Sequence, residues 1–401
     1  MNKKERLLEK FILLLVISSF FFPTINLGIE FRIDDLLALL IIPIFFFVKP
    51  KIRASRLNFT YFLIIFMVIF STLHGYFILK VPPSFRDFNE IIRIIKPFLI
   101  IILVDYCNEN VLTKYLDAFF KRGALFIIMI GFLEYFNLFD FRSILAEIYS
   151  TEGSRYEDIN RKRIIITSGD PNIAAALILY FSTYLTQSLF FRKAVSIKLF
   201  YLFLLLVVLL MTSSRTLLII FVVMIISSLI YHSRRKKLLS IAIFSVCLIT
   251  LVSFVQFFDY LTIGFSTFQS GENNSMLIRY QLWTDALNLF LQSPFFGWGP
   301  AKAIHTTIVD GEHFMLLRRY GIIGYLLIIY LLLGYSLVFL KNKKKISYVG
   351  GRIEMLAFTS FFTCLVIFVI MITNNFFSGY QLMPLYVVMI TLVEKKIKNI
   401  K

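Results

Sequence analysis

The sequence is short of charge: only 16% of its 401 residues are Asp, Glu, Lys or Arg, whereas 58% are hydrophobic and the mean hydropathy is +0.80. This balance excludes a water-soluble enzyme, a secreted disulfide scaffold and a disordered chain, and it predicts a polytopic membrane protein. Acidic residues are the scarcer kind, 24 against 42 basic ones. Because the basic residues fall mostly in short clusters between apolar runs, membrane topology accounts for them, and no nucleic-acid partner is expected.

Cysteine is scarce as well. The three cysteines, Cys107, Cys247 and Cys364, are odd in number and scattered, and two of them lie inside apolar runs. This pattern predicts neither a disulfide framework nor a metal cluster. The sequence also lacks a Walker A motif, a GxGxxG after a strand and an HExxH motif, so we expect no metal and no cofactor.

Apolar runs fill most of the chain. A helix needs about 20 apolar residues to cross roughly 30 Å of hydrocarbon. On that basis we expect an all-α polytopic protein, one integral membrane domain over residues 1–401, with about twelve transmembrane helices. The expected spans are 11–28, 35–48, 58–79, 91–106, 123–139, 170–190, 199–213, 216–231, 238–257, 314–340, 354–373 and 379–393.

The basic clusters predict the topology. Most of the 42 lysines and arginines fall in segments that share one side of the membrane if the N-terminus is cytoplasmic, so the positive-inside rule places both termini in the cytoplasm. Residues 199–231 are interpreted as two short helices, because one helix of that length would measure about 50 Å. A single crossing would also move the basic run 234–237 to the opposite side.

Two external loops are longer than the others, at 140–169 and 258–313. The second, between expected spans nine and ten, contains an amphipathic stretch at 277–291 and a turn rich in proline and glycine at 294–300. We therefore expect a folded periplasmic loop with at least one interfacial helix.

Two arginines combine charge with membrane depth on this outer side. Arg215 lies in the turn SSRT, where hydroxyls accompany a guanidinium in a grouping suited to phosphate oxygens. Arg279 lies on the expected helix in RYQLWTDALNLFLQSPFFGWGP, four residues before a tryptophan. The alternatives are an interface anchor for Arg215 and a solvated helix face for Arg279.

The segment VDGEHFMLLRRYGIIGYL, at the start of the tenth expected span, carries the other candidates. Asp310, Glu312 and His313 lie within four residues, and each could accept a hydroxyl proton. Arg318 and Arg319 follow as further candidate phosphate contacts. Dipole-favoured helix-terminal acids and interface arginines are the alternative interpretation.

Together, in this order and spacing, the segments SSRT, RYQLWTDALNLFLQSPFFGWGP and VDGEHFMLLRRYGIIGYLL closely resemble the bacterial O-antigen polymerase and O-antigen ligase family of integral membrane glycosyltransferases. The stretch TSGDPNIAAALILYF at 167–181 is similar to the family's sequence at the start of a central span. By motif, the resemblance covers roughly residues 165–335.

The resemblance implies a GT-C-like helical fold in the bacterial inner membrane. It implies transfer of an oligosaccharide from undecaprenyl diphosphate to an acceptor sugar at the periplasmic face, without a metal. Arg215 and Arg279 would then engage the diphosphate. Asp310 stands at a family position that is often His or Asp, and His313 stands at the following aromatic position, so the base stays open among Asp310, Glu312 and His313.

Within this family the acceptor separates two activities. A polymerase, of O-antigen or a related surface polysaccharide, extends the non-reducing end of another lipid-linked repeat unit, whereas a ligase modifies a lipid A core sugar. We favour the polymerase, because polymerases are the more divergent. The expected partners are the lipid-linked donor and acceptor, membrane lipids and a chain-length regulator. A flippase or transporter for lipid-linked sugars is the non-enzyme alternative, disfavoured because the candidate charges collect at one face and not at the bilayer midplane.

Overall fold

The structure, a computed structural model, is an assembly of helices. It describes residues 3–26, 30–48, 55–150, 155–160, 163–191, 195–233, 236–254, 274–305, 309–376 and 381–399. The helices in chain order are α1 (Lys3–Phe21), α2 (Ile33–Leu39), α3 (Ile41–Val48), α4 (Arg56–Phe77), α5 (Phe85–Tyr106), α6 (Glu109–Tyr135), the 3-10 turn η1 (Leu138–Asp140), α7 (Phe141–Tyr149), α8 (Arg155–Asn160), α9 (Pro171–Phe191), α10 (Val195–Met211), α11 (Arg215–Ser233), α12 (Lys237–Phe254), α14 (Asn274–Gln292), α15 (Glu312–Val349), α16 (Gly351–Ile370) and α17 (Met383–Asn399).

Every expected span coincides with a helix or a pair of helices, but the number of twelve crossings is not confirmed. Within the described ranges, five helices are long and apolar enough to cross a membrane, namely α4, α9, α11, α15 and α16. A sixth results if α6 and the segment Leu138–Tyr149, which meet at a 113° bend, count as one span. Helices α10 and α12 are apolar but shorter. The chain is therefore a multi-pass membrane protein.

The N-terminal region departs from the prediction. The expected span 11–28 ends at Phe21, and β1 (Thr24–Asn26) pairs with β2 (Glu30–Arg32) in an antiparallel hairpin. Pro23 explains the end of the helix, because proline has no N–H to donate and restricts the residue before it. The expected span 35–48 is likewise two helices, broken at Leu40. Pro43 cannot donate to the carbonyl of Leu39, which favours a break there.

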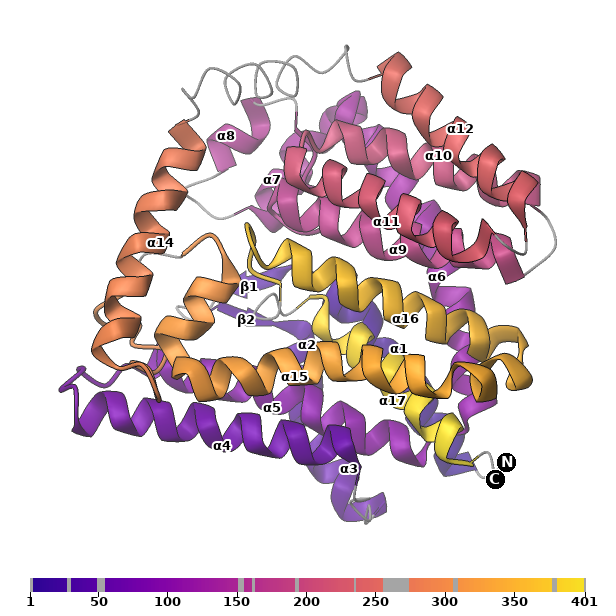
Figure 1. The fold of residues 1–401 in the computed structure, drawn as a ribbon. Helices are drawn as coiled ribbons and strands as arrows, with labels where there is room; N and C mark the ends of the chain where they lie inside the picture. The colour runs from indigo at the N-terminus through magenta and orange to yellow at the C-terminus, as the bar shows by residue number, and fades with distance from the viewer. Residues whose placement is uncertain are drawn as a thin grey trace.

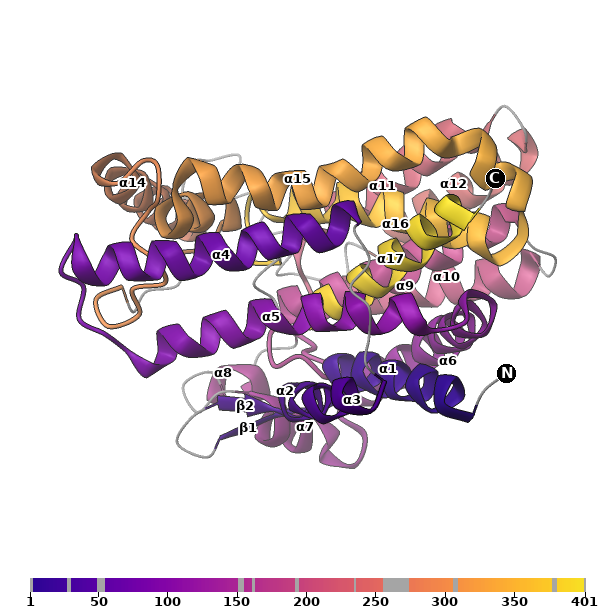
Figure 2. The same ribbon diagram turned by 90° about the horizontal axis from the view of Figure 1, so that it is seen from below.

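The helices form two groups with a layer between them (Figure 1). Helices α4, α5 and α15 run side by side in one group, and α9, α10, α11 and α12 make up the other. Helices α1, α16 and α17 lie between them. Helix α14 stands at one edge and packs on α15, and α1 begins at the opposite edge (Figure 2). The elements that bear the candidate residues therefore gather near α14.

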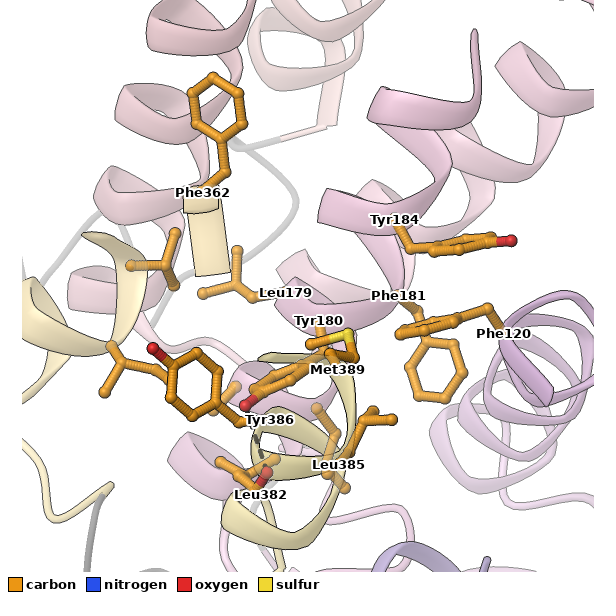
Figure 3. Close-up of a cluster of buried hydrophobic side chains, with 14 of the residues drawn as sticks. Phe120, Leu179, Tyr180, Phe181, Tyr184, Phe362, Leu382, Leu385, Tyr386 and Met389 are labelled. Carbon is orange, nitrogen blue, oxygen red and sulfur yellow. Dashed lines mark hydrogen bonds between the residues drawn. The ribbon is translucent and has the colours of Figure 1, made fainter. Parts of the chain in front are cut away.

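Helix α9 is the buried centre of the fold, with almost all of its side chains enclosed. Its aromatic residues lock it to neighbouring helices: Tyr184 stacks on Phe120 of α6 with ring centroids 4.0 Å apart. The Tyr180 hydroxyl donates to the carbonyl of Leu382, 3.2 Å away, just before α17 (Figure 3). Large aromatic side chains contribute the greatest burial per residue, so these contacts hold α9 firmly between α6 and α17.

Candidate functional site

The predicted amphipathic stretch forms α14, and two of its side chains hold Asp310. Arg279 and Trp283 are four residues apart and so project from the same helix face. Arg279 Nε lies 3.6 Å from Asp310 Oδ2. The Trp283 indole N–H donates to the carbonyl oxygen of Asp310, and the indole stacks on Phe314 with centroids 4.9 Å apart. The Arg-x-x-x-Trp spacing thus fixes Asp310 through both its side chain and its backbone.

Asp310 has an unusual environment for a carboxylate. Its side chain is 52% exposed, whereas that of Arg279 is only 16% exposed. The protein atoms packed on its covered side raise the pKa of the Asp310 carboxyl above its usual value; Arg279 opposes this rise and the carboxylate of Asp170 adds to it. A raised pKa makes a carboxylate a stronger proton acceptor.

Asp170 belongs to the start of α9, in the TSGDPN stretch. Its Oδ1 accepts hydrogen bonds from the backbone N–H of Asn172 at 2.7 Å and of Ile173 at 3.0 Å. This is an N-cap, and Pro171 at the first helical position is the residue that commonly follows one. The local sequence therefore fixes where α9 begins and where Asp170 lies.

The SSRT turn packs beside the start of α9. The predicted division of 199–231 is confirmed: α10 ends at Met211 and α11 begins at Arg215. The Ser214 hydroxyl donates to Asn172 Oδ1 at 2.8 Å. The turn before Arg215 is thus bonded to the start of α9, and the carboxylate of Asp170 there is close enough to Asp310 to affect its pKa.

A buried carboxylate anchors the segment that leads to Asp170. Glu134, on α6, is fully buried, and its two oxygens accept from the backbone N–H of Ile165 at 2.7 Å and of Ile166 at 2.8 Å. Arg163 donates from Nε to the carbonyl of Thr212 at 3.0 Å. The segment is thus tied to α6 and to the SSRT turn.

Glu312 and His313 make structural contacts. Glu312 is fully buried, and its Oε2 accepts from the backbone N–H of Phe376 at 2.6 Å. His313 Nε2 lies 3.0 Å from the carbonyl of Phe368, and Nδ1 lies 3.3 Å from the hydroxyl of Tyr325. Because a carbonyl can only accept, Nε2 carries the proton and Nδ1 accepts from Tyr325. Of the three candidate bases, Asp310 has the exposed oxygen atoms.

The proline- and glycine-rich turn inserts into a break in α15. Gly321 interrupts that helix with a φ of +60°. The carbonyls of Arg318 and Arg319 accept from the backbone N–H of Trp298 at 2.9 Å and of Gly299 at 2.8 Å. Beyond the break, Ile322 donates to the carbonyl of Pro294 at 2.8 Å. The turn therefore satisfies backbone groups that the broken helix leaves open, which explains why the two motifs occur together.

Arg319 belongs to a second cluster of charges. Its Nη1 lies 2.7 Å from Glu90 Oε1, and Lys302 Nζ lies 2.7 Å from Glu90 Oε2. Arg93 Nη1 is 3.9 Å from the same Oε2. Arg318 is buried beside Arg319, and His305 lies close to both: burial lowers the pKa of His305, and the two arginines lower it further. Arg319 is thus joined to α5 through Glu90, and Arg318 is close enough to Arg319 for their charges to interact.

Sequence reasoning missed Asp170, Glu134 and Glu90. The Asp-Pro pair before an apolar run was a usable signal for Asp170, since such a pair marks the start of a helix. Glu134 and Glu90 lie in apolar helices and contact residues 31 and 229 positions away. Only the fold reveals such pairs.

Residues 200–329 match the family model described as O-Antigen ligase. The match begins within α10, includes the SSRT turn and α14, and ends within α15 beyond the break at Gly321. It confirms the resemblance to the O-antigen polymerase and ligase family that the motifs predicted. No curated protein matches the chain. The match supports a ligase- or polymerase-like function, and the family implies lipid-linked polysaccharide substrates and membrane lipids as partners.

Proposed function

We propose that the protein transfers a glycan from a polyprenyl-diphosphate carrier to an acceptor hydroxyl at the periplasmic face, and that Arg279, Asp310 and Arg215 form the centre of its active site. The observation that carries this proposal is the contact between Arg279 and Asp310. It brings a diphosphate-binding side chain and a proton acceptor together beside the start of α9.

Arg279 and Arg215 hold the diphosphate of the donor. A guanidinium group presents a planar fork of N–H donors that matches phosphate oxygens, and its charge persists at any physiological pH. When the bond between the anomeric carbon and the diphosphate oxygen breaks, the electron pair stays on the leaving oxygen. Preorganised cations stabilise that developing charge, a role that does not require a metal ion.

Asp310 serves as the general base. It takes the proton of the acceptor hydroxyl as that oxygen bonds to the anomeric carbon, so the proton ends on Asp310 and the negative charge on the diphosphate. Glu312 is enclosed and bonded to the backbone of Phe376, and both ring nitrogens of His313 have partners. These contacts support Asp310 over its two neighbours.

Donor binding activates this base. Arg279 lies against Asp310 and partly offsets the burial that raises the pKa of the Asp310 carboxyl. A diphosphate competes for the same guanidinium. When the guanidinium of Arg279 turns toward the phosphate, its electrostatic interaction with Asp310 weakens. The pKa of Asp310 then rises, so the carboxylate becomes a stronger base when a donor is present.

The acceptor is a second lipid-linked repeat unit in a polymerase and a lipid A core sugar in a ligase. We propose the polymerase. The matched family description, which names a ligase, favours the ligase as the second candidate.

Reconstitution tests both. The full chain in bilayer nanodiscs is given a lipid-linked repeat unit alone, or the same donor with a lipid A core acceptor. Polymerisation predicts a ladder of longer lipid-linked glycans in the first reaction, and ligation predicts product only in the second. If neither reaction consumes donor, while proteoliposomes move the intact lipid-linked glycan across the bilayer, the proposal is wrong and a flippase is the better description.

A further inference from the structure

A pocket lies between α4, α5, α15 and α17, and neither Arg279 nor Asp310 lines it. Its wall includes Glu90, Arg93, Arg319 and Tyr61. Arg319 lies seven residues beyond Glu312, the first residue of α15, which corresponds to about 10 Å along the helix axis. Lys302, in the loop before α15, reaches the charged end of the pocket through its contact with Glu90.

The pocket is amphipathic. One end carries Arg93 and Arg319 on either side of Glu90. Lys96 also lines it and is held by Asp34 and Asp35 of α2 at 2.5 Å and 2.6 Å. The remaining wall is apolar and comes from Ile94, Pro97, Leu316, Met383 and Pro384. A charged end joined to an apolar wall suits a ligand that has an anionic head and a hydrocarbon chain.

Tyr61 provides an independent sign of a ligand. Its side chain is fully buried, and its hydroxyl has no hydrogen-bond partner among the residues that the structure describes. A buried hydroxyl without a partner costs about 1–3 kcal/mol relative to one that is satisfied. Other buried tyrosines elsewhere in the molecule do have partners, for example Tyr180 with the carbonyl of Leu382. The Tyr61 hydroxyl is therefore available to a bound molecule.

We propose that this pocket binds the phosphate-bearing head of a second lipid, separate from the donor at Arg279. This inference rests on the proposed function, because transfer between two lipid-linked glycans needs two such heads in one protein. Arg93 and Arg319 contact the phosphate oxygens, Tyr61 donates its hydroxyl to the ligand, and the apolar wall contacts the chain. The second lipid is the acceptor, held beside the donor with its glycan on the same side.

Native mass spectrometry of the full chain, with undecaprenyl diphosphate as the probe, tests the pocket. The wild type should bind two probe molecules. Arg93→Gln removes the cation that lies farthest from Glu90, at 3.9 Å, and Tyr61→Phe removes only the hydroxyl group. Each should weaken one of the two binding events roughly five- to tenfold. Unaltered binding of both molecules in both variants overturns the proposal.

Matched substitutions separate binding from folding. Tyr335→Phe removes a buried hydroxyl that does have a partner, the carbonyl of Ala357 at 3.3 Å. Arg352→Gln removes another loosely paired arginine, 3.5 Å from Asp117. Both controls should bind two probe molecules. Tyr61→Phe should melt no lower than the wild type without lipid, whereas Tyr335→Phe should melt lower, because only Tyr335 loses an internal hydrogen bond.

Competing probes identify the source of the head group. An excess of phosphatidylglycerol that displaces the probe from the Arg93-dependent site as effectively as unlabelled undecaprenyl diphosphate supports a phosphate-lipid site but overturns its assignment to the acceptor. Displacement by inorganic pyrophosphate alone, without a chain, overturns the lipid proposal.

Arg279→Lys tests the donor site in the same probe-binding experiment. If that variant binds both probe molecules as the wild type does while Arg93→Gln weakens one binding event, the proposed function fails and the lipid pocket at Arg93 stands. If Arg279→Lys weakens one binding event and Arg93→Gln weakens neither, the lipid pocket at Arg93 fails and the proposed function stands.

Discussion

The indole N–H of Trp283 donates a hydrogen bond to the backbone carbonyl of Asp310, 27 residues later in the chain. This bond ties α14 to the segment that begins α15, while the indole ring stacks on Phe314. A single side chain thereby holds the backbone of Asp310 and packs against Phe314, four residues later. The catalytic proposal depends on that placement.

Trp283→Phe should therefore lower turnover more than it lowers stability. The ring can still stack on Phe314, but the hydrogen bond is lost, at a cost of about 1 kcal/mol. We expect a roughly tenfold fall in turnover, because general-base catalysis requires the base within hydrogen-bond reach of its proton. Glycan transfer and thermal unfolding are measured on the same preparation.

Trp298→Phe is the control for Trp283→Phe. The Trp298 indole also donates to a backbone carbonyl, that of Leu289 at 2.8 Å, but it does not contact Asp310. Trp298→Phe should lose about as much stability as Trp283→Phe and keep most of its turnover. Equal losses of turnover in the two variants would contradict a role for Trp283 in placing Asp310.

The break in α15 predicts an intolerant glycine. At Gly321, φ is +60° and an added Cβ would lie 2.3 Å from the carbonyl oxygen of Phe295. Gly321→Ala should lower the free energy of unfolding by about 3 kcal/mol or more, since it combines a strained backbone with a clash against main-chain atoms. Gly351→Ala has nearly the same φ, +62°, and open space around it, so it should cost only about 1 kcal/mol. Denaturant unfolding in detergent compares them, and equal costs would show that the inserted turn does not constrain α15.

The sequence was sufficient for features that depend on local pattern. Hydrophobic runs predicted where the helices lie, the amphipathic spacing predicted α14, and the length of 199–231 predicted the turn before Arg215. It did not reveal the early end of α1 or the break at Leu40, although Pro23 and Pro43 are visible signals for both. Boundaries near prolines were therefore misjudged, while the positions of the helices were correct.

Contacts between distant helices could not be predicted. Glu90 and Arg319 are 229 residues apart, and no pattern in the sequence indicates that they form an ion pair. Arg319 was a candidate phosphate contact because it is basic and near the membrane surface, but its ion pair with α5 is a property of helix packing. Arg279 and Asp310 were both candidates, yet their mutual contact depends on how the loop between them folds.

The planar fork of Arg279 is central to donor binding, so Arg279→Lys should lose most activity although it conserves the charge. A lysine ammonium cannot donate two parallel hydrogen bonds to a phosphate group, and it is more strongly hydrated. We expect glycan transfer to fall on the order of 10- to 100-fold, with a shorter distribution of glycan lengths on a gel. Arg352→Lys, at an arginine whose Nε lies 3.5 Å from Asp117 Oδ2, is the control for the same exchange. A normal length distribution in Arg279→Lys would remove Arg279 from the site.

The raised pKa of Asp310 predicts the pH dependence of the reaction. A base must be deprotonated, so activity should be complete above the pKa of Asp310 and fall as the pH drops through it. An ordinary aspartate titrates near pH 3.9. Because the pKa of Asp310 is raised above its usual value, mainly by burial, activity should fall at a higher pH than an ordinary aspartate would give. Asp310→Asn should lower turnover on the order of 10²- to 10⁴-fold and abolish this fall, the acid limb of the pH profile, in the residual rate.

Stability separates this role from a structural one. An acid with a raised pKa favours its neutral form in the folded state, so it adds stability at low pH that is lost as the pH rises through that pKa. Asparagine resembles the neutral form, and Asp310→Asn should therefore melt no lower than the wild type at pH 7. Asp285→Asn, at an exposed acid on the same helix as Arg279, should keep both the activity and its acid limb. A lower melting temperature in Asp310→Asn together with an unchanged pH profile would assign Asp310 a structural role and leave the reaction without its base.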